Sequence, residues 1–414
     1  MSFKWKKTVL GQCCNRIVGG GTPARNIDKY WDGNIPWITV KDFSSFSPIT
    51  SQEYITELGV KNSSTNIIPA GTLITATRIG LGRAFIYQVD VSINQDMKAL
   101  FLNSDCDTLY MMYWFQLNGN KIEAIGTGST VKGITLQQLQ HLEISLPYSL
   151  TVQQHIADIL TSCDEVIEQT EKAIAKYQAI KTGMLQDLFT RGVVANGKLR
   201  PTPEEAPELY KDSPLGKIPK EWDILPLSEL VEFIRNGTTQ PQTPFVTEYP
   251  VSRIETISEG IIDYQHVGYL SQNAASYKME VGDILFSHIN SLKHIGKVAL
   301  KNDDKLLFHG MNLLLIRCNN KIEATFLYYL LQRHKMVFER IANSAVNQAS
   351  INQTELQKII LAKPMHNEQK AILKILAPIE KIIQKEYCSL NKYISIKQGL
   401  MKKLLTPPEG ALEA

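Results

Sequence analysis

The segment AIKTGMLQDLFT at residues 179–190 returns as SIKQGLMKKLLT at residues 395–406, and the architecture follows from this recurrence. The copies end at Thr190 and Thr406, so their offset in residue number is 216 (406 minus 190). Weaker matches at nearly the same offset run through the chain in the same order. They pair Trp5 with Trp222, Leu10 with Leu227, Thr22 with Thr239, Gly71 with Gly282, Ile134 with Ile351, Leu139 with Leu356, Pro147 with Pro364, and Gln154 with Gln369. A period of this length indicates a duplicated domain and not a solenoid repeat.

The first part of each repeat reads as a globular α+β domain. Short runs rich in β-branched and aromatic residues, bounded by turn signals, predict strands. These runs lie at residues 35–40, 71–77, 85–91, 249–254 and 312–317, while helical patterns cover residues 108–117 and 324–342.

The second part of each repeat reads as one long helix. Apolar or small residues recur with the 3-4 spacing of a coiled-coil seam. In the first copy they are Ile156, Ile159, Cys163, Val166, Thr170, Ala173, Tyr177, Ile180 and Met184. In the second copy they are Leu376, Ile379, Ile383, Tyr387, Leu390, Ile394, Met401 and Leu405, with Lys397 or Gln398 interrupting the stripe. Pro378 is expected to kink or restart the second helix.

Between the repeats lies a segment rich in Pro and Gly, which predicts a linker that carries the chain back along the first helix. Each helix of about 40 residues would extend roughly 60 Å, and the two helices most simply pack antiparallel. The expected fold is therefore α+β, with two similar globular domains separated by two long antiparallel coiled-coil helices in a pseudo-twofold internal repeat. The boundaries are residues 1–150 for the first domain, 151–191 for the first helix, 192–221 for the linker, 222–367 for the second domain and 368–406 for the second helix.

Composition is that of an ordinary globular protein, with 43% hydrophobic residues in 414 and a net charge of only +3. The first domain carries 13 Lys and Arg against 11 Asp and Glu, and the second carries 14 against 14. A nucleic-acid binder with this balance needs clustered charges or help from a partner. The six scattered cysteines, without a CxxC pair, favour reduced thiols and a cytoplasmic location. No apolar run is long enough for a membrane span or a signal peptide.

Motifs for catalysis are missing from the sequence. It contains neither a phosphate-binding loop of the Gly-x-x-x-x-Gly-Lys type nor an Asn-Pro-Pro-aromatic motif for amino methylation. Cys13 and Cys14 have no second ligand pair with metal-site spacing. The run Gly19 to Gly21 could cradle a phosphate but is more typical of a plain turn. We therefore expect no catalytic residues, metal site or cofactor in this chain.

Three stretches resemble the specificity subunits of type I restriction-modification systems. GGGTPARNIDKYWDGNIPWITVKDF at residues 19–43 is similar to the opening of a target recognition domain of that family. YKDSPLGKIPKEWDILPLSEL at residues 210–230 resembles the central junction. KPMHNEQKAILKIL at residues 363–376, followed by the long helix, resembles the distal region.

The resemblance implies a non-catalytic DNA sequence-recognition subunit in which each target recognition domain reads one half of a bipartite, asymmetric DNA site. The helices would set the spacer and dock two methyltransferase subunits, and restriction motor subunits would join for cleavage. S-adenosylmethionine, ATP and Mg would then be used by the partners. Readers on a pseudo-twofold frame are expected about one helical turn of DNA apart, roughly 34 Å, or at multiples of it.

Candidate DNA contacts are polar residues that interrupt the strand-like segments, because loops carry recognition and these side chains can reach bases or phosphates. In the first domain they are Lys41, Arg78, Arg83, Thr127, Ser129, Thr130 and Lys132. In the second domain they are Arg253, Ser287, His288, Asn290, Lys293, Lys297, Ser344, Asn347 and Gln348. The alternative for each is an ordinary surface side chain.

Two other function classes stay open at this point. The chain itself could cut or methylate DNA, which the missing motifs argue against. It could also be a scaffold whose long helices dimerise, but a symmetric scaffold would not need different polar loops on matched frames.

Overall fold

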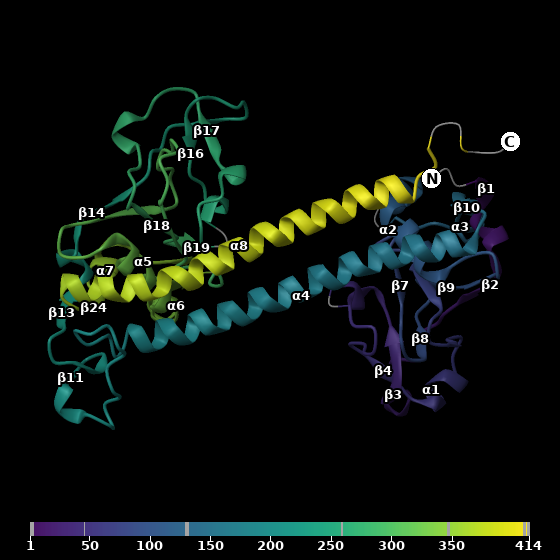
Figure 1. Cartoon of the computed structure of the whole chain (residues 1–414), viewed down its shortest axis with the longest axis horizontal. Coiled ribbons are helices and arrows are strands. Elements are labelled where there is room, and N and C mark those ends of the chain that lie inside the picture. The colour runs from purple at the N-terminus through teal and green to yellow at the C-terminus, as the bar shows by residue number, and fades with distance from the viewer. Residues whose placement is uncertain are drawn as a thin grey trace. The chain divides into compact units, whose positions relative to one another are not determined.

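The computed structural model describes residues 4–44, 46–128, 132–257, 260–345, 348–408 and 411. The chain divides into two compact units. Unit 1 joins Met1–Ala173 to Glu386–Ala414, and unit 2 is Ile174–Lys385. Each unit therefore contains one globular domain together with a part of each long helix (Figure 1).

Unit 1 contains the first globular domain, built mainly on two four-stranded sheets. The strand orders are β2-β9-β6-β7 and β4-β3-β8-β5, and β1 pairs with β10. The strands are β1 (Trp5–Val9), β2 (Cys14–Gly19), β3 (Trp31–Ile38), β4 (Tyr54–Ile55), β5 (Ile67–Ile68), β6 (Leu73–Ala76), β7 (Ala84–Ile86), β8 (Val91–Ile93), β9 (Met97–Leu102) and β10 (Glu143–Pro147). The helices are α1 (Glu57–Lys61), α2 (Thr108–Ile125), α3 (Leu136–Gln140) and the start of α4 (Leu150–Leu188).

Unit 2 keeps one four-stranded sheet, β14-β21-β18-β20, and adds smaller sheets. The strands are β11 (Tyr210–Ser213), β12 (Gly216–Pro219), β13 (Asp223–Pro226), β14 (Val231–Asn236), β15 (Gln242–Thr243), β16 (Pro250–Val251), β17 (Gly268–Leu270), β18 (Ile284–Phe286), β19 (Ile289–Asn290), β20 (Val298–Leu300), β21 (Leu314–Cys318), β22 (Asn343–Ala345), β23 (Gln348–Ser350) and β24 (Ile360–Lys363). The helices are α5 (Ala324–Arg333), α6 (Lys335–Ile341), α7 (Gln353–Gln357) and the start of α8 (His366–Leu404).

The duplication predicted from sequence is visible in the sheets. The order β2-β9-β6-β7 in unit 1 corresponds to β14-β21-β18-β20 in unit 2, and the pair β1-β10 corresponds to β13-β24. The remaining sheets differ, because β4-β3-β8-β5 has no four-stranded counterpart among the described residues of unit 2. Each domain thus combines a repeated frame with structure of its own.

Gly20 and Gly237 lie at repeat-equivalent positions where neighbouring backbone leaves no room for a side chain. A Cβ on Gly20 would meet the carbonyl oxygen of Ile93 at 1.9 Å, and a Cβ on Gly237 would meet that of Gly310 at 2.0 Å. Both backbones therefore pack directly against a neighbouring segment. Gly19 ends β2, and Gly20 and Gly21 continue as closely packed irregular backbone, so the run is not the plain turn that the sequence favoured.

The long helices are continuous, α4 over 39 residues and α8 over 39 residues. Their pairing is antiparallel: Asp164 of α4 contacts Lys397 of α8, while Lys181, further along α4, contacts Glu380, earlier in α8. The predicted restart at Pro378 is wrong, because α8 continues through it. The described helices include none with the length and apolarity of a membrane span.

The phase of the predicted seam is partly wrong. Val166 and Ile180 were expected in the seam of α4, but 41% and 42% of their surfaces are exposed, as is 43% of Tyr387 in α8. The predicted Ile156 and Thr170 are buried, and the buried stripe of α4 also includes Leu160 and Ile174, which were not in the predicted seam. A helix turns about 100° per residue, so a shift of one position moves a side chain to another face.

Two buried glutamine side chains fasten the globular domains to the helices. In unit 1, Gln153 of α4 donates to the carbonyls of Asp105 and Pro147, both at 2.9 Å, and accepts the N–H of Asp107 at 2.9 Å. Both Gln153 and its counterpart Gln369 have no exposed surface. Each amide is held by three backbone groups.

In unit 2, Gln369 of α8 makes the same three bonds. It donates to the carbonyls of Lys321 and Pro364 at 3.2 and 3.0 Å and accepts the N–H of Glu323 at 2.8 Å. The sequence match of Gln369 with Gln154 was therefore one residue off, because Gln154 is exposed and Gln153 makes the equivalent bonds.

The linker does not travel back along the first helix, contrary to the sequence prediction. It packs within unit 2, where Val193, Ile218 and Trp222 join the core around Leu188 and Phe189. The carboxylate of Glu368 holds the linker in this position. It accepts hydrogen bonds from the Val193 N–H at 2.9 Å, the Trp222 indole at 3.0 Å and the Arg200 guanidinium at 3.1 Å.

Candidate nucleic-acid interface

The polar residues predicted as contacts gather mainly at two neighbouring segments in each domain. In the first domain these are the 3-10 turn Val40–Ser44 and the connection from β6 to β7. In the second domain they are the backbone at Arg253, just before the 3-10 turn Glu255–Ile257, and the connection from β18 to β20. Both connections close with the same backbone bond, from Ala76 N to Arg83 O at 3.2 Å and from Ser287 N to Lys297 O at 2.8 Å.

The first-domain site combines cations with aromatic rings. Lys41 and Arg83 are both exposed. The Arg83 guanidinium lies 5.8 Å from the ring centre of Phe43, and the Lys41 ammonium lies 3.6 Å from Glu53. The Phe46 ring is partly exposed and lies 4.6 Å from that of Phe85. Aromatic faces beside Lys and Arg suit stacking on bases and contact with phosphates.

The buried carboxylate of Asp42 fixes the turn that carries Lys41. One oxygen accepts the N–H of Thr39 at 2.8 Å. The other accepts the Ser51 hydroxyl at 3.0 Å and the Gln52 N–H at 2.8 Å. The turn is thus held from both sides, and Lys41 stands on a rigid base.

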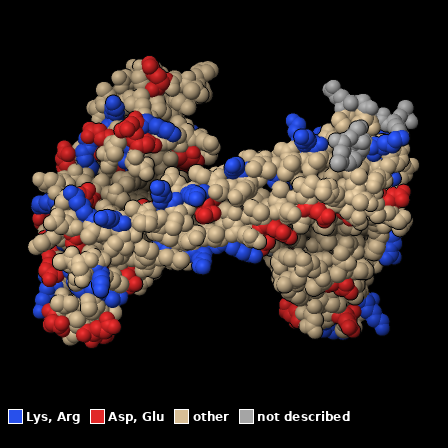
Figure 2. Space-filling view, viewed as in Figure 1, with Lys and Arg blue, Asp and Glu red and all other residues tan. Residues whose placement is uncertain are grey.

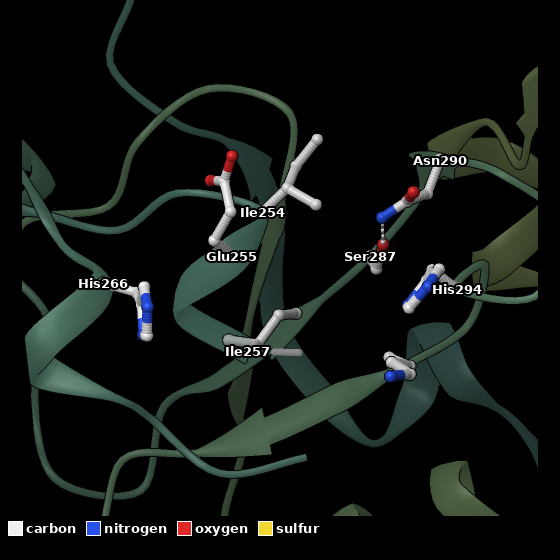
Figure 3. A pocket seen from close by; sticks show the side chains of 8 residues that line it. Ile254, Glu255, Ile257, His266, Ser287, Asn290 and His294 are labelled. Atoms are coloured by element: carbon white, nitrogen blue, oxygen red, sulfur yellow. Dashed lines mark hydrogen bonds between the residues drawn. The ribbon is translucent and has the colours of Figure 1, made fainter. Parts of the chain in front are cut away.

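The second-domain site is a cavity of about 350 Å³. Its lining includes Glu255, His266, Ser287, Asn290, His294 and Lys297 on a base that contains Ile254 and Ile257. Figure 3 shows these side chains arriving from separate segments around one space. Asn290 donates to the Ser287 hydroxyl at 3.2 Å, which orients the amide. The sequence-predicted Ser287, Asn290 and Lys297 therefore come together.

Arg78, Thr127 and Lys132 lie near one another in the first domain through backbone bridges. Gly133 bridges both Arg78 and Thr127, and Lys132 is the residue before it. All three predicted side chains are exposed, and Arg78 lies 3.7 Å from Asp96. The second domain builds the same ribbon as the three-stranded sheet β19-β23-β22.

Five predicted contacts lie wholly or partly outside the described residues. Ser129, Thr130 and Asn347 lie outside the described residues. For Ser344 and Gln348 only the backbone is described, in β22 and β23 respectively.

The expectation of accessible loop side chains is wrong for Ser287 and His288. Both are buried, and His288 is only 8% exposed. The carbonyl of His288 accepts the N–H of Ile351, so the residue continues the sheet instead of lying in a loop. Burial lowers the pKa of the His288 imidazole and favours its neutral form.

Arg253 and Lys293 are exposed as predicted. The Arg253 guanidinium lies 3.5 Å from the Glu255 carboxylate, and both side chains are about half exposed. An ion pair at such a surface contributes little to stability and exchanges readily for another partner.

Four residues of the two sites were not predicted from the sequence: Glu255, His266, Phe43 and Phe46. The signal was present for Phe43 and Phe46, which flank Ser44 and Ser45 close to the chosen Lys41. Glu255 was not predicted because cations and amides are the more usual DNA-contacting side chains, although a carboxylate can also read a base edge.

Charge is mixed on the one face of the molecule that Figure 2 shows. On the face shown in Figure 2, Lys and Arg side chains are interspersed with Asp and Glu. The described residues also contain no group of three His, Cys, Asp or Glu arranged to hold a metal ion. The first site offers cations beside aromatic rings and the second offers hydrogen-bonding side chains around a cavity, and hydrogen bonding to base edges is the chemistry of sequence readout.

Comparison with known proteins agrees with this architecture. Residues 3–177 and 219–392 each match the type I restriction modification DNA specificity domain. The chain is 27% identical to the type I restriction enzyme MjaIX specificity subunit of Methanocaldococcus jannaschii, over 94% of this chain and 90% of that protein. A putative MjaX specificity subunit of the same organism is 45% identical, but over only 48% of this chain and 49% of its own length.

The fold also resembles a solved structure. The S subunit of a type I restriction-modification system from M. genitalium matches with a TM-score of 0.60 and 15% identity, covering 98% of this chain and 96% of that one. The duplicated domains on paired helices are the architecture of a DNA-specificity protein. The chain belongs to the type I restriction-modification DNA specificity family.

This assignment confirms three predictions: the α+β fold with two similar domains and two long helices, the role as a DNA sequence-recognition subunit, and the non-catalytic class. It also implies DNA binding and assembly with other restriction-modification subunits.

Proposed function

We propose that each globular domain reads one half of a bipartite, asymmetric DNA site, while α4 and α8 set the spacing between the half-sites. The observation that carries this proposal is that the two domains share the same sheet framework and helix attachment but present different side chains at their candidate interfaces. Gln153 and Gln369 make the same three bonds to their domains, yet the side chains around the candidate interfaces differ. A matched frame with different contacts suits two readers of different sequences.

Two methyltransferase subunits would dock on the helices. Among the exposed apolar side chains of the long helices are Val166 and Ile396 in unit 1, and Ile382 and Ile180 in unit 2. These are repeat equivalents, because 382 minus 166 and 396 minus 180 both give 216. Exposed apolar residues at duplicated positions support two copies of one partner.

The chemistry would reside in the partners. The methyltransferase subunits would use S-adenosylmethionine, and restriction motor subunits would use ATP and Mg. The six free thiols support the prediction of a cytoplasmic protein. The mixed surface charge suggests that the partners complete the grip on DNA, since affinity for DNA depends largely on neutralising phosphates.

Methylation mapping of DNA modified by the full chain with its methyltransferase tests the proposal. We expect two unlike half-sites separated by a fixed gap of unspecified bases. A four-residue insertion near Ala175, with the matching insertion in α8, should change the gap and leave both half-sites unchanged. Continuous targets, or a gap that the insertion does not alter, would contradict the proposal.

A further inference from the structure

The two candidate interfaces can be compared residue by residue, because their backbones are held alike. The Thr39 N–H donates to Asp42 at 2.8 Å, and the Arg253 N–H donates to Thr256 at 2.8 Å. These bonds equate Thr39 with Arg253, and 253 minus 39 gives an offset of 214. The same offset places Glu255 at the position that Lys41 occupies in the first domain, since 255 minus 41 is also 214.

A second pair of residues is matched by contacts of its own. The closing bonds of the two connections equate Arg83 with Lys297 at an offset of 214, while their other ends, Ala76 and Ser287, differ by 211 because the second connection is three residues longer. Gly82 and Gly296, which precede them, have positive φ values of 77° and 72°. One position in the two sites therefore keeps a cation, Arg83 or Lys297, while another changes sign from Lys41 to Glu255.

The sign change separates two kinds of DNA contact. Every phosphate carries negative charge, so a cation is useful at any sequence and a carboxylate is repelled. A carboxylate becomes favourable where it accepts a hydrogen bond from the exocyclic amino group of a base in the major groove. A lysine at the same place donates to the O6 and N7 acceptors of guanine.

The surroundings of Glu255 fit such a contact. It lines the 350 Å³ cavity together with Asn290 and Lys297, so further donors and acceptors are at hand. Its ion pair with Arg253 is 3.5 Å long and about half exposed, and a base can replace it at small cost. Figure 3 shows the Glu255 carboxylate beside the open space of the cavity.

We propose that the Lys41/Glu255 position determines specificity in both domains. Glu255 accepts a hydrogen bond from the exocyclic amino group of cytosine or adenine in one half-site. Lys41 donates to guanine in the other. This inference rests on the proposed function and adds to it the class of base that each site reads.

Selection from a randomised duplex library tests the inference, using the full chain assembled with its methyltransferase. The variants are Glu255→Gln, Glu255→Lys and Lys41→Gln. Glu232→Gln is the matched control, an exposed carboxylate on β14 of the same domain. Thermal unfolding of each assembly shows that the variants are folded.

We expect Glu255→Gln to reduce discrimination about tenfold at one base position of one half-site. Glu255→Lys should move that position from an amino-bearing base to guanine. Lys41→Gln should relax one position of the other half-site, and Glu232→Gln should select the wild-type motif.

Two possible outcomes distinguish the failure of this inference from the failure of the proposed function. If the wild-type assembly selects a bipartite motif and the Glu255 variants select the same motif, or bind all sequences uniformly more weakly, the inference is wrong and the proposed function stands. If the wild-type assembly selects no bipartite motif, the proposed function fails as well.

Discussion

The Nζ atom of Lys397 in α8 lies 2.5 Å from Oδ1 of Asp164 in α4. The other carboxylate oxygen of Asp164 accepts the hydroxyl of Tyr113 at 2.8 Å, and Tyr113 belongs to α2 of the globular domain. The Lys397 ammonium also lies 5.2 Å from the Tyr113 ring centre. This cluster joins the domain of unit 1 to both long helices.

Unit 2 contains the same cluster with the helices exchanged. Lys181 of α4 lies 2.8 Å from Glu380 of α8, which accepts the hydroxyl of Tyr329 from α5. The two clusters are related by the repeat offset of 216, which is the result of 329 minus 113, of 380 minus 164 and of 397 minus 181. Each lysine therefore belongs to the cluster of the other repeat's globular domain: Lys397 to that of unit 1 and Lys181 to that of unit 2.

Replacing Lys397 with Met should loosen unit 1 alone. Methionine keeps the apolar stem but leaves Asp164 without its cation. Because the Asp164 side chain is 40% exposed, solvent screens the pair and the loss should be only about 1 kcal/mol. Hydrogen exchange should accelerate in α2, while α5 keeps its protection. Lys181→Met should show the reverse pattern, and equal effects in both units would contradict the assignment.

Replacing Gln369 with Leu should cost more, roughly 2–4 kcal/mol in unit 2, because three backbone groups lose their buried partner. Gln153→Leu should do the same in unit 1. The control is Gln154→Leu, which alters an exposed side chain and should be nearly neutral. Denaturant unfolding with segment-resolved hydrogen exchange measures these effects. A neutral Gln369→Leu would show that the anchor is dispensable.

The second domain should lose stability as the pH falls from 6.5. Burial lowers the pKa of His309 from its usual 6.5 to about 4, and the ring donates to the Leu313 carbonyl at 3.0 Å. Between pH 6.5 and about pH 4 this histidine is therefore protonated in the unfolded chain and neutral in the folded domain. Acidification in this range favours unfolding. The loss should reach about 2 kcal/mol at pH 5.

The variant His309→Gln separates this effect from other titrations. Its amide can still donate to the Leu313 carbonyl, but it does not titrate. The slope of unfolding free energy against pH between 6.5 and 5 should therefore decrease. His288 and His334, whose pKa values are also lowered by burial, would supply the slope that remains. An unchanged slope would exclude His309 as a source.

Charged substitutions at one exposed apolar pair should remove one partner subunit. Val166→Glu with Ile396→Glu alters unit 1, and Ile180→Glu with Ile382→Glu alters unit 2. Since all four side chains are 39–44% exposed, the chain itself should stay folded. Native mass spectrometry with the methyltransferase should show two bound copies for wild type and one for either variant. Two copies bound to both variants would place docking elsewhere.

The repeat made most of the frame predictable from sequence. Trp5 and Trp222, matched at the outset, are both buried at the start of β1 and just before β13. Such matches survive because the same core positions must be filled twice. Which face of a helix each residue occupies was harder to predict from the sequence. Gln154 was chosen over Gln153, and only the bonds to distant backbone groups distinguish the two neighbours.

The candidate site was predictable in location but not in detail. Lys41, Arg83, Asn290 and Lys297 fall at the matched segments, because polar residues between strands usually mark loops. His288 did not follow that rule. Its burial depends on pairing with Ile351, far downstream in the chain, and local sequence does not encode such a partner.

Unit 1 is built from two separate parts of the chain, and this constrains the order in which the two units fold. Met401 and Leu405 belong to the same core as Leu10 and Tyr110, although all of unit 2 intervenes along the chain. During synthesis, the first domain must wait for the ribosome to deliver Leu405 before its core is complete. Unit 2, being continuous in sequence, can close first. The part of the protein that is made earliest is therefore the part whose core is completed last.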